Sequence, residues 1–235
     1  MAETPTAIEI DVPGNGRVSG CVYLAPERAR LGVTVMLAPG AGAPHTSAFM
    51  VLFGHGLAAR GLDVVTFNFP YQEQRRRVPD RTEVLETAYL AAIERAARDL
   101  PLADNRLFIG GKSLGGRMAS HLGASRRELD LGGLVFLGYP LHPPAKPTQL
   151  RAVHLRQIVV PMLFVQGSRD PFGTPDELRP VLAPLGTRAH IYIVDGGDHS
   201  LKVPKSTPIR QEDVYERVQN EIRSWIEAQT TMPAA

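Results

Sequence analysis

The chain has 235 residues, of which 43% are hydrophobic and 21% are charged, and its formal net charge is +2. This length suits one substantial domain, and so small a net charge gives no electrostatic case for binding nucleic acid or an acidic membrane surface. Cys21 is the only cysteine, which excludes an internal disulfide and a cysteine-based metal cluster and suits a reducing compartment. We expect one domain (residues 1–235), soluble and cytoplasmic, with neither a nucleic-acid nor a membrane partner; the oligomeric state stays open.

Short segments rich in valine, isoleucine and aromatic residues recur along the chain and are typical of strands. The first two are joined across residues 13–17 and predict an antiparallel hairpin. The later ones alternate with helical patterns, which predicts an α/β fold: a mostly parallel sheet of about eight strands, covered by helices on both faces, with function at the carboxyl ends of the strands. The expected strands are Ala7–Val12, Val18–Leu24, Val33–Leu37, Val64–Phe69, Leu107–Gly110, Leu134–Leu137, Met162–Val165 and His190–Val194.

Three helices are predicted from start signals and apolar faces. Asp80 and Glu83 have the spacing of a capping box, and Thr174 with Glu177 starts a second helix that Gly186 is expected to end. The last helix carries an apolar stripe, for which packing against the sheet is the simplest interpretation. The apolar faces comprise Leu85, Tyr89, Ala92, Ile93, Ala96 and Leu100 in the first helix, and Val214, Val218, Ile222, Trp225 and Ile226 in the last.

Residues 111–115 read G-K-S-L-G and directly follow a predicted strand. The pattern G-x-S-x-G in this position is the signature of a nucleophile elbow, a sharp turn from strand to helix that exposes one serine hydroxyl. The turn is strained and crowded, and Gly111 and Gly115 relieve clashes because they lack Cβ atoms. The motif therefore predicts that Ser113 is a nucleophile.

Two nucleotide-binding motifs were weighed against this interpretation. A P-loop ends in G-K-S, as residues 111–113 do, but it needs a glycine where this chain has Arg106. The glycines at residues 14–16 and 40–42 do not complete G-x-G-x-x-G, since Ser19 and His45 occupy the last glycine positions. No nucleotide site is predicted.

A serine nucleophile needs a histidine base, and that base needs an acid to hold its ring. His199 lies in the turn Gly196–Ser200, just beyond the final predicted strand, from which its ring can reach Ser113. Asp170 follows the strand Met162–Val165, at the point expected for the acid in the chain order serine, acid, histidine. Asp195 and Asp198 are nearer in sequence, and we interpret them as turn formers. The remaining histidines lie elsewhere: His45, His55, His121, His142, His154 and His190.

Acyl transfer also needs N–H groups that stabilise the oxyanion. The backbone of Leu114 supplies one, and the loop after the third strand, residues 38–44, supplies the other. Ala41 is our first choice for this second donor and Gly42 our second.

These motifs, in this order, are similar to those of α/β-hydrolases, in particular small bacterial proteins related to dienelactone hydrolases. The resemblance covers nearly the whole chain, and it implies a catalytic triad and no cofactor. Dienelactone hydrolases use a cysteine nucleophile where this chain has Ser113, so their substrate is not carried over. A similar hydrolase-like domain occurs in a subunit of a eukaryotic histone acetyltransferase complex, which makes a scaffolding role an alternative. The stretches concerned are Leu37–Pro44, Asn68–Tyr71, Gly110–His121, Phe136–Pro143, Phe164–Thr174 and Gly196–Lys205.

The substrate pocket is expected beside the predicted strand ends. Tyr71 follows the fourth strand, and Tyr139 and His142 lie in a proline-rich segment after the sixth. We expect these three side chains to contact substrate; for the proline-rich segment the alternative is a purely structural crossover. Residues 138–161 are too few for a separate cap domain.

Charged residues near the same edge suggest an anionic substrate. Arg75, Arg76 and Arg77 follow Tyr71, and guanidinium groups bind carboxylate or phosphate well. A solvated charged loop is the simpler interpretation. Lys202 and Lys205, close to His199 in sequence, raise the same question.

The sequence thus predicts a serine hydrolase that cleaves a small-molecule ester or thioester through Ser113, His199 and Asp170, without metal or cofactor. The main alternative is a non-catalytic scaffold that keeps the fold. A peptidase is a lesser alternative, because no segment is large enough to form a selective gating domain.

Overall fold

A computed structural model describes residues 4–99 and 102–231 of the protein. Its centre is one eight-stranded sheet of order β1-β2-β4-β3-β5-β6-β7-β8. The β1–β2 and β2–β4 pairs are antiparallel, and all the other neighbouring strands are parallel. The strands are β1 Thr6–Val12, β2 Gly16–Tyr23, β3 Val33–Ala38, β4 Asp63–Phe67, β5 Arg106–Lys112, β6 Leu131–Leu137, β7 Met162–Gly167 and β8 Ala189–Val194.

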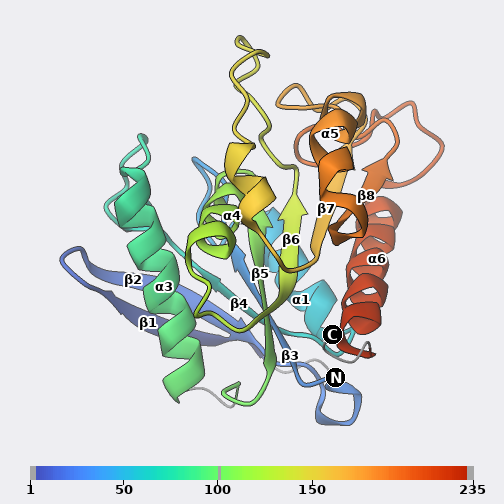
Figure 1. Cartoon of the computed structure of the whole chain (residues 1–235). Helices are drawn as coiled ribbons and strands as arrows, with labels where there is room; N and C mark the ends of the chain where they lie inside the picture. Colours follow the sequence, from blue (N-terminus) through green and yellow to red (C-terminus); the bar gives the residue numbers. More distant parts are fainter. Residues whose placement is uncertain (1–3, 100–101, 232–235) are drawn as a thin grey trace.

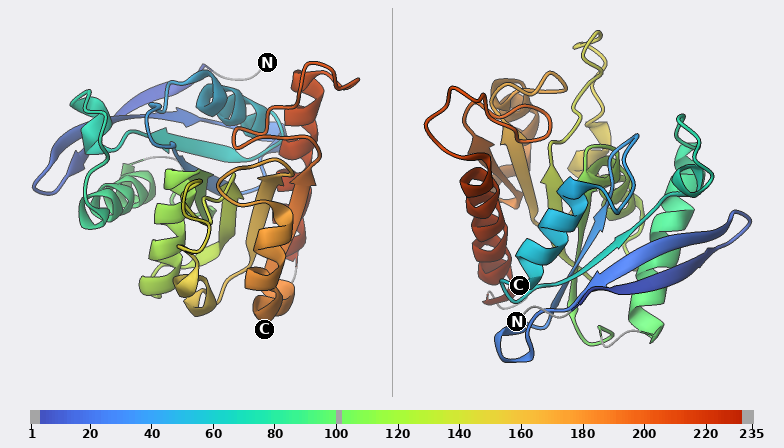
Figure 2. Two further views of the ribbon diagram at one scale, coloured as in Figure 1. Left: turned by 90° about the horizontal axis from the view of Figure 1, so that it is seen from above. Right: turned by 180° about the vertical axis from the view of Figure 1, so that it is seen from behind.

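Helices cover both faces of this sheet (Figure 1 and Figure 2). Residues of α3, α4 and α5 share one buried apolar cluster with the sheet, and residues of α1 and α6 share another on the opposite face. The expected α/β fold is therefore confirmed. The helices are α1 Ala48–Ala58, α2 Pro70–Glu73, α3 Thr82–Asp99, α4 Leu114–Ser125, α5 Pro175–Leu182 and α6 Gln211–Thr231, with short 3-10 helices at Glu27–Ala29, Val153–Gln157 and Ala183–Arg188.

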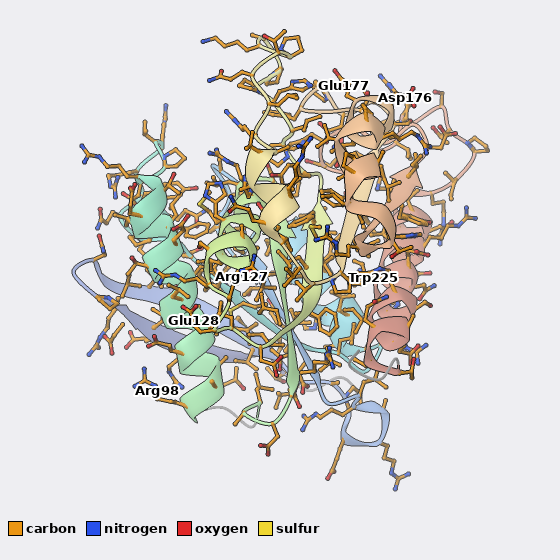
Figure 3. All side chains as sticks on the ribbon, viewed as in Figure 1. Arg98, Arg127, Glu128, Asp176, Glu177 and Trp225 are labelled. Carbon is orange, nitrogen blue, oxygen red and sulfur yellow. The ribbon has the colours of Figure 1, made fainter. Side chains whose placement is uncertain are left out.

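The apolar stripe of the last helix faces the core, as expected. Its five residues are buried, and Trp225 packs edge-on against Phe108 of β5 with ring centroids 6.0 Å apart. Figure 3 shows Trp225 where α6 passes the lower part of the sheet. Within the described residues, no helix is both long and apolar enough to pass through a membrane.

Some predicted boundaries and one cap differ from the structure. Asp80 does not cap α3: its carboxylate accepts a hydrogen bond from the Tyr71 N–H at 2.8 Å and pairs with Arg76, so it ties down the preceding loop. α5 ends at Leu182, and Gly186, with φ of +60°, lies inside the 3-10 helix that follows. Leu100 lies outside the described residues.

The loops that follow the parallel strands gather at one edge of the sheet, the upper edge in Figure 1. They include the loop after β3, the loop between β6 and β7, and the loop between β8 and α6. Residues 138–161, between β6 and β7, hold only the 3-10 helix Val153–Gln157 and form no cap domain, as predicted.

Candidate active site

Ser113 stands at the junction of β5 and α4 in a strained backbone conformation. Its φ is +49° and its ψ is −109°, which is a costly region for a residue with a side chain. The Ser113 N–H donates to the Leu137 carbonyl at 3.1 Å and its carbonyl accepts from the Arg117 N–H at 3.0 Å, so both neighbouring elements hold the turn. This is the conformation of a nucleophile elbow.

The two motif glycines are needed because the turn lies directly against β3. A Cβ on Gly111 would come within 2.2 Å of the Ala38 carbonyl oxygen, and one on Gly115 within 2.1 Å of the same atom. Backbone cannot yield by that much, so a side chain at Gly111 would push β5 away from β3, and one at Gly115 would push α4 away from the sheet.

The structure brings Ser113, His199 and Asp170 into one hydrogen-bonded chain. His199 Nε2 lies 2.7 Å from Ser113 Oγ, and His199 Nδ1 lies 2.8 Å from Asp170 Oδ2. These partners assign the tautomer in which Nδ1–H donates to Asp170 and Nε2 accepts from the serine hydroxyl. Asp170 is fully buried, whereas 19% of the His199 side chain is exposed on the cavity side.

Asp170 is held by two donors besides His199. The Phe172 N–H donates to Oδ1 at 2.8 Å, and Gln166 Nε2 donates to Oδ2 at 2.8 Å. Gln166 is itself buried at the end of β7, and its amide also bonds the Gly173 carbonyl and the Tyr139 backbone. Sequence reasoning missed Gln166; its signal was a single polar residue inside the apolar strand Met162–Gly167.

The loop that carries His199 is fixed from below by Lys112. Lys112 Nζ donates a short hydrogen bond to the His199 carbonyl, and its ammonium lies 5.9 Å from the centroid of the Phe49 ring. Burial lowers the pKa of Lys112 to about 8, although the carboxylates of Asp170 and Asp198 act in the opposite direction. Sequence reasoning had noted Lys112 only as part of a rejected P-loop.

Two further contacts shape the space around the imidazole. A Cβ on Gly138, whose φ is +68°, would lie 2.7 Å from the His199 carbonyl oxygen, so a side chain there would displace the histidine loop. The Phe172 ring packs over the imidazole with centroids 4.2 Å apart. Together they leave His199 little freedom to rotate away from Ser113.

Asp195 and Asp198 act as the turn residues that we expected. Asp198 Oδ1 accepts from the N–H groups of Ser200 and Lys202, and so closes the turn around His199. Asp195 is exposed and accepts a long hydrogen bond from Ser168 Oγ at 3.4 Å. Neither contacts the imidazole.

The candidate oxyanion donors lie beside Ser113. Leu114 is the first residue of α4, and an N–H in that position has no partner inside its helix. The loop after β3 is positioned by Gln72, whose Nε2 donates to the carbonyls of Gly40 and Ala43 at 3.2 and 2.6 Å. Gly40 and Ala41 line the cavity at Ser113, and Gly42 is not among the described lining residues. Of the two second donors considered, Ala41 therefore fits the position better.

A cavity of about 760 Å3 opens at Ser113 and His199. Part of its lining is apolar, and the rest includes cationic residues from four segments of the chain. Asp80 is the only carboxylate among its described lining residues. Besides Ser113 and His199, the lining includes Ala41, Phe49, Met50, Pro79, Asp80, Leu85, Lys112, Leu114, Arg117, Met118, Pro140, Arg151, Phe172, Lys202 and Tyr215.

The side chains predicted to contact substrate are instead buried, and they are absent from the described lining of the cavity. Tyr71 and Tyr139 are fully buried, and the Tyr139 hydroxyl donates to the Arg151 carbonyl at 2.7 Å. His142 is also buried, where its Nδ1 and Nε2 meet the Pro143 carbonyl and Glu177 at 3.0 and 3.2 Å. Figure 3 labels Glu177 at the start of α5. These residues shape the loops, and none of the three lines the cavity.

The arginine run after α2 does not reach the cavity either. Arg75, Arg76 and Arg77 are all exposed, and Arg76 pairs with Asp80. The solvated-loop interpretation therefore fits these three residues. Of the two lysines, Lys202 lies on the rim and Lys205 is absent from the described lining.

A second serine–histidine contact lies farther along α4. Ser120 Oγ is 2.7 Å from His154 Nε2, and the ring of His154 packs edge-on against that of His121 with centroids 4.4 Å apart. His121 in turn pairs with Glu86 at 3.0 Å. Within the described residues, no group of three or more histidine, cysteine, aspartate or glutamate side chains is arranged to hold a metal ion.

Comparison with known proteins agrees with this fold. A family model described as an alpha/beta hydrolase domain matches residues 32–227. A lidless α/β serine hydrolase from Xanthomonas campestris superposes with a TM-score of 0.69 at 17% identity, covering 100% of this chain and 98% of that one. A dienelactone hydrolase from Anabaena variabilis gives 0.74 at 19% identity, covering 97% and 99%. A puromycin-hydrolysing peptidase from Mycobacterium tuberculosis gives 0.73 at 16%, covering 97% of this chain and 40% of that one.

Proposed function

The chain belongs to the α/β hydrolase family, and from its site we propose that it is a serine hydrolase that cleaves esters or thioesters of small or medium acyl groups. The observation that carries the proposal is the chain of hydrogen bonds from Ser113 through His199 to Asp170, at 2.7 and 2.8 Å, at the mouth of a cavity. Nucleophilic catalysis by serine needs this arrangement of hydroxyl, base and acid.

In the proposed reaction Ser113 Oγ attacks the substrate carbonyl while His199 Nε2 accepts the hydroxyl proton. Asp170 stabilises the imidazolium and keeps its Nδ1–H in place. The N–H groups of Leu114 and Ala41 stabilise the oxyanion, which forms beside the N-terminus of α4 where the helix dipole also favours negative charge. The protonated His199 then gives its proton to the leaving oxygen or sulfur.

Deacylation repeats the same steps with water. His199 takes a proton from a water molecule that attacks the acyl-enzyme carbonyl, and it returns the proton to Ser113 Oγ as the acid product leaves. Every step uses groups of this chain, so the proposal requires neither a metal nor a cofactor.

The alternatives make different use of the same fold. A scaffold would not need an ordered triad, a strained serine or a cavity at its hydroxyl, and all three are present. A peptidase would need room for a polypeptide and selection at the entrance, and residues 138–161 are too few to form a gating domain. Esters and thioesters of small acids are therefore the preferred substrates.

The test is hydrolysis of 4-nitrophenyl esters and matching thioesters of two to eight carbons by the full chain. We expect turnover by the wild type and a loss of at least about 10^4-fold in Ser113→Ala, with Ser125→Ala, an exposed serine at the end of the same helix, unchanged. Turnover in Ser113→Ala equal to that of the wild type would exclude Ser113 as the nucleophile. Folded wild type that is no faster than buffer would favour the scaffold.

A further inference from the structure

Two arginines reach the cavity from elements far apart in the sequence. Arg117 lies on α4, one helical turn after Ser113, and Arg151 lies in the segment between β6 and β7. Both are half-buried. The backbone of Arg151 is fixed on both sides, since its N–H donates to Leu141 at 2.7 Å and its carbonyl accepts from the Tyr139 hydroxyl at 2.7 Å. Both arginines therefore form part of the cavity wall that also includes the nucleophile.

Neither guanidinium is neutralised. Within the part of the chain that the structure describes, no carboxylate lies within ion-pair distance of Arg117 or Arg151, and the buried Nε of Arg117 has no hydrogen-bond partner. Arg76, in contrast, pairs with Asp80, the one carboxylate in the described cavity lining. A half-buried, unpaired guanidinium is costly, and it is found where a ligand supplies the missing acid.

The two charges also act on each other. Burial lowers the pKa of Arg117, and the charge of Arg151 lowers it further, so the two groups are close enough to repel. Burial lowers the pKa of both His121 and His154, and the charge of Arg117 lowers it further. Glu86 accepts a hydrogen bond from His121 at 3.0 Å and is absent from the described cavity lining. One carboxylate cannot balance two guanidinium groups, so the charge at this end of the cavity is positive.

We propose that Arg117 and Arg151 form an anion subsite that selects esters or thioesters bearing a second, ionised carboxylate. The inference rests on the proposed serine hydrolase activity and names its substrate class. Paired guanidinium forks match a carboxylate better than a point charge does. The apolar side chains of Leu114 and Met118 lie on the same helix as Arg117, so a short hydrocarbon chain spans from Ser113 to the subsite.

The kinetic test compares mono-4-nitrophenyl adipate with 4-nitrophenyl hexanoate, which has the same chain length and no second acid. We expect kcat/KM to be at least tenfold higher for the adipate ester. Arg117→Gln and Arg151→Gln are each expected to reduce the ratio of the two kcat/KM values about tenfold, and Arg117→Lys to reduce it less. Arg77→Gln, at an exposed arginine, is the control and leaves the ratio unchanged. Because the readout is a ratio within one preparation, partial misfolding of a variant does not alter it.

A second pair of substrates locates the carboxylate. 4-Carboxyphenyl hexanoate and phenyl hexanoate differ only on the alcohol side. A preference in this pair that depends on Arg117 and Arg151 assigns the subsite to the leaving group. A preference in the adipate pair assigns the subsite to the acyl group. Equal rates in both pairs, or a preference that survives both arginine variants, would overturn the proposal.

A binding measurement separates the anion subsite from catalysis. Adipate is expected to raise the melting temperature of Ser113→Ala, hexanoate to raise it less, and neither effect to persist when both arginines are replaced by glutamine. Absence of any adipate effect would overturn the subsite. Adipate binding by a wild type that hydrolyses neither ester would count against the proposed function while leaving the subsite in place.

Discussion

The helix α4 begins at one serine–histidine pair and carries a second along its length, and the two hydrogen bonds have the same length. Ser113 Oγ is 2.7 Å from His199 Nε2, and Ser120 Oγ is 2.7 Å from His154 Nε2. The surroundings of the two serine–histidine pairs differ. His199 has Asp170 at its other nitrogen and a cavity before it. His154 stands beside His121, and among the described residues no carboxylate bonds its ring. Ser120 is fully buried, and its hydroxyl donates to the Arg117 carbonyl at 2.6 Å.

A short serine–histidine distance therefore does not by itself make a nucleophile. The histidine base must carry a proton in the transition state. A carboxylate that is hydrogen-bonded to its other ring nitrogen stabilises the resulting positive charge. Burial and the positive charges of His121 and Arg117 lower the pKa of His154 to about 4, so this ring stays neutral at pH 7 and serves only packing and hydrogen bonding. The serine must also be exposed, which the strained turn achieves for Ser113 alone of the two.

The largest effect is expected from removing the acid that distinguishes the two pairs. In Asp170→Asn the amide can no longer hold the required histidine tautomer, and we expect kcat for a neutral ester to fall by about 10^4. Asp198→Asn is the matched control, because that side chain only closes a turn and its amide oxygen still accepts hydrogen bonds. A fall of less than tenfold in Asp170→Asn would assign the acid elsewhere.

A smaller loss is expected from Lys112→Met, which removes the donor to the His199 carbonyl. The histidine loop loosens, and we expect kcat to fall about tenfold at pH 7 with folding retained. Because the pKa of Lys112 is about 8, the wild-type kcat should decline as the pH rises through 8 and the ammonium loses its proton, whereas the variant lacks that decline. Lys202→Met on the cavity rim is the control. Equal pH profiles for Lys112→Met and the wild type would rule out this positioning role.

The smallest functional effect is expected at the second pair. His154→Gln should leave kcat unchanged and alter only stability against pH. The folded pKa near 4 lies below the unfolded value near 6.5, so the unfolded chain takes up the proton first and stability is lost as the pH falls from 6.5 to about 4. Because solvent screens part of the effect at this half-buried ring, urea unfolding at pH 7 and pH 4.5 should show a loss about 1 kcal/mol larger in the wild type than in the variant. Identical losses would contradict the assignment of a neutral, buried His154.

The features that could be predicted from sequence are those fixed by local sterics or by strand order. The elbow could be predicted because its turn lies directly against the neighbouring strand. This close approach requires residues without a Cβ atom, as at Gly111 and Gly115. The positions of Asp170 and His199 followed from chain order, because carboxyl ends of parallel strands share one edge. Their contacts with each other and with Ser113 could come only from the folded chain.

The features that could not be predicted depend on which distant segments meet. Arg75, Arg76 and Arg77 form a dense local run, yet they point into solvent, while Arg117 and Arg151 are isolated in sequence and meet because the segment after β6 returns over α4. Tyr71 and Tyr139 follow strand ends as substrate contacts would, but packing buries their rings, and neither lines the cavity.

The most direct measurement is to treat the folded full-length protein with a fluorophosphonate and to map the adduct by peptide mass spectrometry. We expect an adduct on Ser113 alone, lost in His199→Ala and kept in His154→Ala, with Ser120 on the same helix unmodified as an internal control. No adduct on folded protein, an adduct on Ser120, or labelling of Ser113 that persists in His199→Ala would contradict it.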